Sequence, residues 1–290
     1  MRSNNSNYGK KSDKYNLNKQ VYNDLALLYE YSAKVIVKRR INQMDNMEAR
    51  AEHQTRKKFN LVYTISAALG VILAIVLITW LIHFRDGFGT EDPNRIFNWH
   101  PLLMIFGMVC CYSQSILIFR TGRNLPKKKL KLIHMFLNLT AFILSVLGII
   151  AAFASHNLKN PPVANLYSLH SWIGLTTAIM FGLQFVIGFT GFLFPGYPGA
   201  IRAAILPIHT ASGVGIFLFA IIAAITGMVE KIIFGLKDTY ESLPAEALLA
   251  NFMGMVLILF GVLVMYLVTA FEYKRVPIAE DTMILQSHTN

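Results

Sequence analysis

Six apolar stretches, each long enough to cross a bilayer as a helix, constrain the fold of this 290-residue chain more than any other feature. About 20 helical residues cross the hydrocarbon of a bilayer, and the backbone inside it must satisfy its own hydrogen bonds. A helix does so within one segment. We therefore predict six transmembrane helices, over residues 61–83, 99–119, 131–154, 167–193, 203–228 and 249–271.

The composition fits an integral membrane protein, since 54% of the residues are hydrophobic and only 15% are charged. The net charge of +11 would favour a nucleic-acid partner in a soluble protein. Here the basic residues stand beside the apolar stretches, as the positive-inside rule requires. We therefore expect the lipid bilayer as a partner, and no nucleic acid.

The basic residues also predict an orientation. Arg56, Lys57 and Lys58 precede the first apolar stretch, and residues 120–131 bring a second basic cluster between the second and third stretches. The first and third connections contain few basic residues. Because cytoplasmic loops carry the excess of Lys and Arg, and the number of spans is even, both termini are expected in the cytoplasm.

Two polar flanks surround the six-helix domain, which is predicted over residues 61–275. Residues 1–60 form a basic cytoplasmic extension, and its first 19 residues, rich in Asn, Ser and Lys, are expected to be disordered. From Val21 to Val35, apolar residues recur at helical spacing, which is typical of either an amphipathic helix on the membrane or a solvated helix. Residues 276–290 form a short polar cytoplasmic tail.

Four histidines lie in the second to fifth apolar stretches, one in each: His100, His134, His170 and His209. A histidine in a membrane helix is costly without a partner and marks a candidate functional site. In the predicted orientation, His100 and His170 lie near the non-cytoplasmic surface, while His134 and His209 lie in the cytoplasmic half. They form two pairs, each from alternate helices of a four-helix unit.

Each pair suits a haem, because haem iron has two axial positions and imidazole is a common ligand for it. Zinc or copper would need three or four His, Cys or carboxylate ligands at one site, which neither depth offers. The near absence of Asp and Glu from the spans argues against an ion-coupled transporter. We predict an all-α membrane protein with two bis-histidine haems in a core formed by helices 2–5. The alternative from another class is a haem-free transporter or membrane adaptor whose histidines bond neighbouring helices.

Short motifs around these histidines carry a family resemblance: FNWHP (97–101), KLIH (131–134), NLYSLHSW (165–172), LPIH (206–209) and GMVEK (227–231). Over roughly residues 61–275 they resemble the cytochrome b-561 family, and in particular its animal ferric reductases and secretory-vesicle members. The resemblance implies haem b on His100 with His170 and on His134 with His209. It also implies a homodimer that takes electrons from cytoplasmic ascorbate.

On the cytoplasmic side, SILIFR (115–120) resembles the ascorbate motif of the family. The resemblance implies contacts with ascorbate or haem propionates for Arg120, Lys127, Lys131, Arg202 and Lys274. Lys127 and Lys131 are four residues apart, and Lys131 stands one turn before His134, so helical spacing lets them share a face. The stretch from Arg120 to His134 is shorter than in the duodenal relative, which weakens the match of Arg120. The same basic residues also serve as topology signals.

On the opposite side, His156 corresponds to a histidine at the ferric-substrate site of the duodenal relative. The alternative is a surface histidine with no role, because the loop from His156 to His170 is longer here. Further positions match the segment that packs on the outer haem and a carboxylate that contacts it: Asn165, Leu166, Tyr167, Ser168 and Glu230.

Together, these features predict a transmembrane oxidoreductase that moves electrons from ascorbate through two haems to a non-cytoplasmic acceptor. If the acceptor is ferric iron, the protein is a ferric-chelate reductase. If it is monodehydroascorbate, the protein regenerates ascorbate inside a vesicle. No sorting signal decides between the plasma membrane and a secretory or endocytic vesicle membrane.

Overall fold

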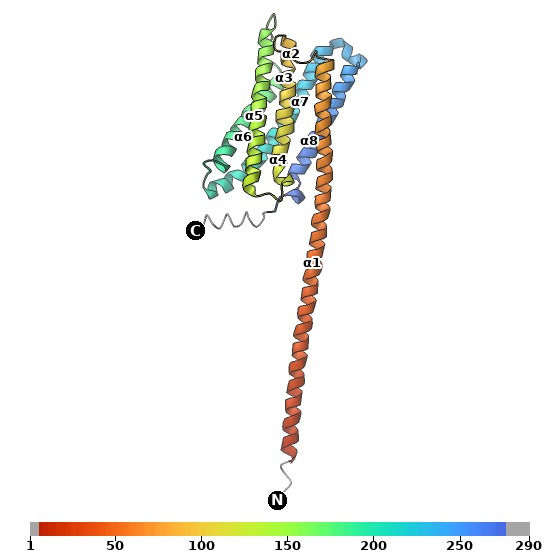
Figure 1. The fold of residues 1–290 in the computed structure, drawn as a ribbon, viewed down its shortest axis with the longest axis vertical. Coiled ribbons are helices and arrows are strands. Elements are labelled where there is room, and N and C mark those ends of the chain that lie inside the picture. The colour runs from red at the N-terminus through yellow and green to blue at the C-terminus, as the bar shows by residue number, and fades with distance from the viewer. Residues whose placement is uncertain (1–5, 277–290) are drawn as a thin grey trace. The chain divides into compact units, whose positions relative to one another are not determined.

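The computed structural model describes the backbone of residues 6–276 and the side chains of residues 21–276. It divides into two compact units, Met1–Lys57 and Lys58–Asn290. Within the described range the regular elements are helices (Figure 1): α1 (Ser6–His83), α2 (Pro93–Phe97), α3 (Trp99–Met104), the π-helix η1 (Ile105–Cys111), α4 (Tyr112–Thr121), α5 (Lys127–Leu158), α6 (Leu169–Phe192), α7 (Gly199–Leu236), the 3₁₀ helix η2 (Lys237–Ser242), α8 (Ala245–Thr269) and the 3₁₀ helix η3 (Phe271–Tyr273).

Six segments are long and apolar enough to cross a membrane, which confirms the prediction of an all-α protein with six membrane-spanning helices. They are Val21–His83, Pro93–Thr121, Lys127–Leu158, Leu169–Phe192, Gly199–Ser242 and Ala245–Thr269. The second span combines α2, α3, η1 and α4. The fifth extends beyond its predicted end at residue 228, because the helix continues through Glu230 and Lys231. A prediction from hydrophobicity ends the span at the first charged residues, whereas the helix itself continues past them.

The first unit is helical wherever it is described. Helix α1 begins at Ser6, whereas residues 1–19 were expected to be disordered; residues 1–5 lie outside the described range. The segment from Ser6 to His83 contains no proline, and a helix that already exists lengthens without a new nucleation step. Side chains 21–54 are exposed. The predicted tail beyond residue 276 also lies outside the described residues.

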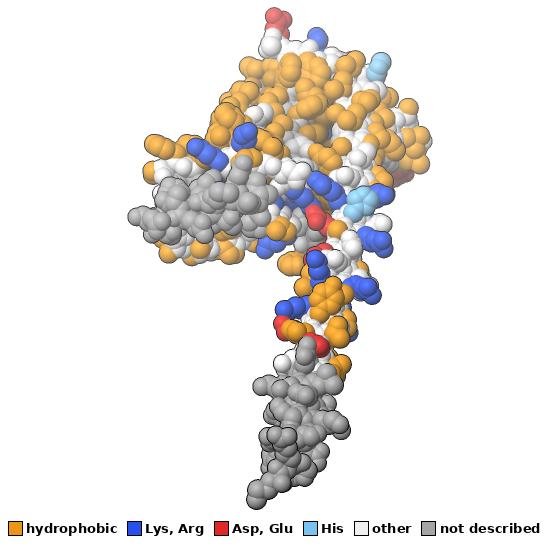
Figure 2. Space-filling model, turned by 60° about the horizontal axis from the view of Figure 1, so that its bottom comes forward, with side chains coloured by type: hydrophobic (Ala, Val, Ile, Leu, Met, Phe, Trp, Pro, Cys, Tyr) orange, Lys and Arg blue, Asp and Glu red, His pale blue; other side chains and the backbone are white. Residues whose placement is uncertain are grey.

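The six-helix unit packs around large apolar side chains that are almost fully buried. They come from α1, α6, α7 and α8 and include Leu73, Leu77, Trp80, Phe181, Phe217, Phe260 and Leu267. Helix α5 contacts the α2–α4 segment, and α7 contacts both α6 and α8. Figure 2 shows hydrophobic side chains over most of the visible flank of this body. An apolar surface of this extent is typical of a protein that faces lipid.

The unit has two ends, named here by the histidine that each contains. The His100 end holds the end of α1, the starts of α3, α6 and α8, and the ends of α5 and α7 (Figure 1). The His134 end holds the end of α4, the starts of α5 and α7, and the ends of α6 and α8. Between them, Tyr112 donates a 2.7 Å hydrogen bond to the carbonyl of Gly213 and so joins the second span to the fifth.

Candidate functional site

Two pairs of histidine rings face each other within the six-helix unit. His100 of α3 and His170 of α6 have ring centres 6.0 Å apart and planes at 80°. At the other end, His134 of α5 and His209 of α7 have ring centres 6.3 Å apart and planes at 67°. The structure therefore brings together the residues that the sequence analysis paired, and both pairs have nearly the same spacing.

This spacing fits one metal ion between each pair of rings. An imidazole nitrogen bonds a metal at about 2 Å, so two rings on opposite sides of one ion have centres about 6 Å apart. In the described part of the chain, no group of three or more His, Cys, Asp or Glu side chains could hold a metal ion. Each pair thus supplies two ligands, as the two axial positions of a haem require.

Backbone carbonyls orient three of the four rings through Nδ1. His100 donates to Gly148 at 3.0 Å, His170 to Ala223 at 2.8 Å and His134 to Ser115 at 2.8 Å. A carbonyl only accepts, so Nδ1 carries the proton and Nε2 of the neutral ring keeps its lone pair. A second-shell bond of this kind fixes the tautomer and direction of a metal-ligating histidine. These three rings are ready to bind through Nε2.

His209 differs from the other three. Its Nδ1 is buried and has no hydrogen-bond partner among the described residues. Its backbone carbonyl accepts a 2.6 Å bond from Gln184, which fixes this turn of α7. A buried ring nitrogen without a partner is costly. Among the four rings, His209 is therefore the one whose Nδ1 the described residues leave unsatisfied.

Glycines make room for two of the rings. A Cβ at Gly227 would lie 2.5 Å from Cε1 of His170, and a Cβ at Gly188 would lie 2.8 Å from Cε1 of His209. Contacts below 3.0 Å are essentially never seen for real Cβ atoms. Helices α6 and α7 therefore approach closely at both depths because these positions have no side chain.

Three of the predicted basic residues share the His134 end. Lys127 and Arg202 are the cations that act electrostatically on Lys131, and the Lys131 amino group donates a 3.0 Å bond to the carbonyl of Phe192. Arg202 and Lys127 are exposed, whereas Lys131 is half-buried. The group combines two helix starts, α5 and α7, into a positively charged surface one turn from His134. Such a surface attracts an anion.

Arg120 and Lys274 are held differently. Arg120 donates through Nη1 to the carbonyl of Ala270 at 2.5 Å, and Arg123 is the charged group that acts on it. Arg123 in turn donates to the carbonyl of Tyr273 at 3.0 Å. Lys274 follows η3 and is exposed. Arg120 is thus bonded to the carbonyl that ends α8.

Arg275 adds to the same connection between α4 and α5. Its guanidinium donates to the carbonyl of Arg123 at 3.3 Å and to that of Leu125 at 3.0 Å. The α4–α5 connection and the segment after α8 therefore each donate hydrogen bonds to the other.

At the His100 end, His156 is held by Asn165. Nδ1 of His156 lies 3.1 Å from Oδ1 of Asn165, whose Nδ2 donates to Asn157 at 2.8 Å. With the amide nitrogen used as a donor, Oδ1 accepts from His156, and Nε2 of this half-buried ring keeps its lone pair. The ring also stacks on Phe97, with centres 6.2 Å apart and planes at 8°. His156 is therefore fixed in direction, unlike a typical surface histidine.

The segment 165–168 starts α6 and thereby positions His170. Ser168 forms a capping box with Ser171, and Trp172 donates from its indole to the carbonyl of Leu166 at 2.9 Å. Leu166 has φ +56°, a region that side-chain-bearing residues rarely adopt. The indole bond and the cap hold this strained turn in place.

Glu230 lies close enough to Tyr167 to act on it. Partial desolvation, together with the charge of Glu230, raises the pKa of Tyr167 above its ordinary value. The phenol therefore stays protonated, and remains a hydrogen-bond donor, at neutral pH and well above it. The two residues come from the α5–α6 connection and from α7, so both matched positions meet at the His100 end.

Lys231 was not singled out from the sequence. Its Nζ lies 4.0 Å from the ring centre of Phe97, and the Phe97 ring is 5.7 Å from that of His100. A lysine at the end of an apolar stretch usually serves as an interfacial anchor, so spacing alone gave no signal. The GMVEK motif, of which Lys231 is the last residue, was the only available pointer.

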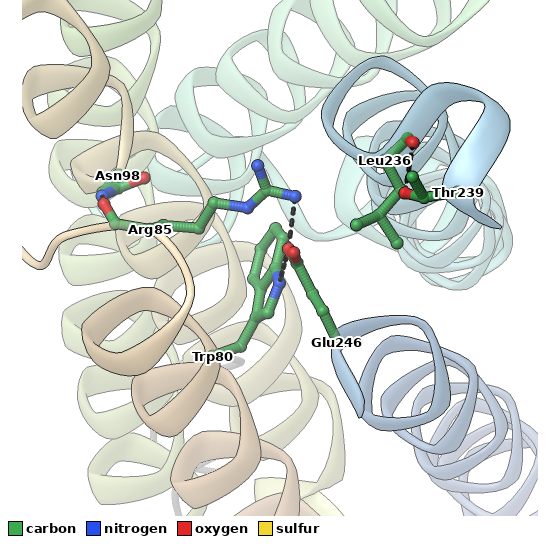
Figure 3. Close-up of polar contacts among 6 residues, drawn as sticks. All are labelled: Trp80, Arg85, Asn98, Leu236, Thr239 and Glu246. Atoms are coloured by element: carbon green, nitrogen blue, oxygen red, sulfur yellow. Dashed lines mark hydrogen bonds and ion pairs between the residues drawn. The ribbon is translucent and has the colours of Figure 1, made fainter. Parts of the chain in front are cut away.

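A buried ion pair was also missed. Arg85, after α1, pairs with Glu246 at the start of α8, and Trp80 donates to the same carboxylate at 2.8 Å (Figure 3). The Arg85 guanidinium also lies over the Trp80 ring, 5.2 Å from its centre. Asn98 bonds the carbonyl of Arg85 at 2.7 Å. These contacts join the first, second and sixth spans at the His100 end.

Comparison with known proteins places these features in context. The model of the eukaryotic cytochrome b561 family matches residues 99–235, which include all four paired histidines. The chain is 38% identical over 231 residues to a lysosomal membrane ascorbate-dependent ferrireductase of Danio rerio, covering 77% of this chain and 93% of the relative. Its identity to the protein of that name from Homo sapiens is 40% over 223 residues, covering 75% and 91%. A plasma membrane ascorbate-dependent reductase of Xenopus tropicalis is 39% identical over 222 residues, covering 76% and 78%.

Proposed function

Because the chain belongs to the eukaryotic cytochrome b561 family, we propose that it carries electrons across a membrane from ascorbate through two haem b groups. One haem would be held by His100 and His170, and the other by His134 and His209. The observation that supports this most is the near-identical spacing of the two ring pairs, 6.0 and 6.3 Å. Both distances fit a metal with two imidazole ligands.

The protein contributes orientation and charge to this reaction. A haem bound there would supply one-electron chemistry, and the residues around it would tune its potential. With two histidines as its protein ligands, it would offer no position for oxygen. The carbonyls of Gly148, Ala223 and Ser115 hold three ligand rings in a fixed direction. No moving part is required between two sites held in one helical body.

The donor side is the His134 end in this proposal. Ascorbate is an anion at neutral pH, and Lys127, Lys131 and Arg202 together offer it positive charge beside the inner pair. Ascorbate loses its proton at this surface. Only the electron crosses, because the spans contain no chain of titratable residues from one end to the other.

The orientation follows from the basic residues at the His134 end. The positive-inside rule assigns this end, and with it both termini, to the cytoplasm. The curated relatives are named as lysosomal or plasma membrane proteins. We propose a location in the plasma membrane or in an endocytic or secretory vesicle membrane, and a homodimer as the working assembly.

The acceptor side is the His100 end, and we propose a ferric chelate as the acceptor. The supporting observation is His156, whose ring is held by Asn165 and Phe97 with Nε2 available for a metal. The relatives named as ferrireductases act on this class of substrate. Monodehydroascorbate is the second candidate acceptor.

A reduced-minus-oxidised spectrum of the purified protein tests the haem proposal. We expect the bands of low-spin bis-histidine haem, with His170→Ala and His209→Ala each removing a different part of them. A colourless protein would instead support the haem-free transporter or adaptor. For the acceptor, vesicles loaded with ascorbate would be supplied with external ferric chelate or with monodehydroascorbate. Faster oxidation of the haems by the radical than by the chelate would overturn the ferric assignment.

A further inference from the structure

Lys231, in α7, has no role in the electron transfer proposed above. Its Nζ is 4.0 Å from the ring centre of Phe97, and the ring centres of Phe97 and His100 are 5.7 Å apart. Phe97 is thus a neighbour of both a cationic side chain and a histidine of the outer pair. A cation over an aromatic face is attracted by the ring, which holds the ammonium in place.

The charge of Lys231 is not neutralised by a carboxylate of its own. In the part of the chain whose side chains are described, the salt bridges are Glu30–Lys34 and Arg85–Glu246. Glu246 does act on Lys231, but its carboxylate is already paired with Arg85 and bonded to Trp80 (Figure 3). The other charged groups that act on Lys231 are cations, Arg85 and Lys159.

A half-buried ammonium without its own counterion is costly for a fold. The charge of this ammonium also acts strongly on neighbouring groups, because charges interact more strongly where water is excluded. His100 is among the groups on which the Lys231 charge acts. A charge held in this way stabilises a nearby site that gains an electron.

We propose that Lys231 is a positioning residue that raises the reduction potential of the haem held by His100 and His170. The fixed positive charge favours the reduced form of that haem over its oxidised form. It acts much less on the pair at the other end of the bundle, because the interaction between charges falls with distance. Electron transfer from the inner to the outer haem is thereby made more favourable. This inference rests on the two haem sites proposed above.

The experiment is a potentiometric titration of the haem bands in purified, haem-loaded protein. Lys231→Met removes the charge but keeps an unbranched side chain one atom shorter, and Lys231→Arg keeps the charge. Lys237→Met is the matched control, because Lys237 is an exposed lysine at the same end. Lys231→Met should make reduction of the outer haem about tenfold less favourable, a fall of about 59 mV for one electron. The inner haem, the arginine variant and the Lys237 control should stay at wild-type potentials.

The two haems are assigned by the bands that His170→Ala and His209→Ala remove. An unchanged outer potential in Lys231→Met with full haem content would overturn the inference, as would an arginine variant that behaves like the methionine variant. If Lys231→Met loses the outer haem, Lys231→Gln, which keeps a polar end without the charge, decides between charge and packing. A wild-type protein without haem bands would instead refute the proposed function.

Discussion

Gly227 and His170 are in closer contact than any side chain at position 227 would permit. A Cβ at that position would lie 2.5 Å from Cε1 and 2.7 Å from Nδ1 of the imidazole. Nδ1 of the same ring also donates a 2.8 Å bond to the carbonyl of Ala223, one turn earlier in α7. A side chain at position 227 would therefore have to displace the ring from this bond.

This contact predicts that Gly227→Ala selectively removes the outer haem. The added methyl group must push the ring off its carbonyl, and with it the ligand nitrogen. Haem content per chain should fall by half, as measured by a haem extraction assay, while the inner haem keeps its spectrum. Gly215→Ala is the matched control in the same helix, because a Cβ there meets nothing within 4 Å. Equal haem content in both variants would contradict the role of Gly227.

Lys131 should set the affinity for ascorbate. Charge-assisted hydrogen bonds contribute about 1.5–3 kcal/mol, so Lys131→Met should raise the KM for ascorbate roughly tenfold or more. Stopped-flow reduction of the haems at varied ascorbate concentration measures this. Lys128→Met, at an exposed position in the same helix, should leave the KM unchanged. A similar rise in both variants would point to general surface charge rather than to a specific contact.

The Arg85–Glu246 pair should contribute to stability rather than to electron transfer. Breaking a buried ion pair by removing one partner costs about 3–5 kcal/mol, because the other charge stays buried. Glu246→Gln keeps an acceptor for Trp80 but leaves Arg85 unpaired, so thermal unfolding in detergent should shift to clearly lower temperature. The control Glu241→Gln changes an exposed carboxylate at the same end and should unfold like the wild type. Coincident unfolding curves for all three proteins would show that the pair is energetically unimportant.

His156 should affect the reduction of the acceptor and not the oxidation of ascorbate. In His156→Ala, ferric-chelate reduction should slow about tenfold because the acceptor loses its proposed ligand, a change that corresponds to about 1.4 kcal/mol of binding free energy. The rate at which ascorbate reduces the haems should not change. The exposed His83, also at the His100 end, gives a control in His83→Ala. If His156→Ala reduces the chelate at the wild-type rate, a different group binds the acceptor.

The spans and the four paired histidines could be predicted from the sequence because each leaves a local signal. An apolar run long enough to cross lipid has few alternatives to a helix. His100, His134, His170 and His209 stand out within such runs, since buried imidazole is costly. Their depths followed from the basic residues alone, and the structure places His100 opposite His170 and His134 opposite His209.

The remaining site features depend on contacts that sequence spacing does not encode. Trp80 and Glu246 are separated by 166 residues, and neither is unusual beside an apolar stretch. Lys231 resembles an interfacial anchor until α7 is seen to continue past it and place it over Phe97. The π-helix at Ile105–Cys111 gave no signal in the residue pattern, and such helices are rare.

The bonds between the α4–α5 connection and the segment after α8 also constrain the order in which the protein can be completed. Arg120 and Arg123 donate to carbonyls 150 residues further along the chain. A ribosome adds about 5–20 residues per second, so roughly eight to thirty seconds of synthesis separate the two sides of these bonds. All four helices that carry the paired histidines are therefore synthesised before the α4–α5 connection can form these bonds. A chain that stops short of Ala270 would contain both histidine pairs and still leave that connection open.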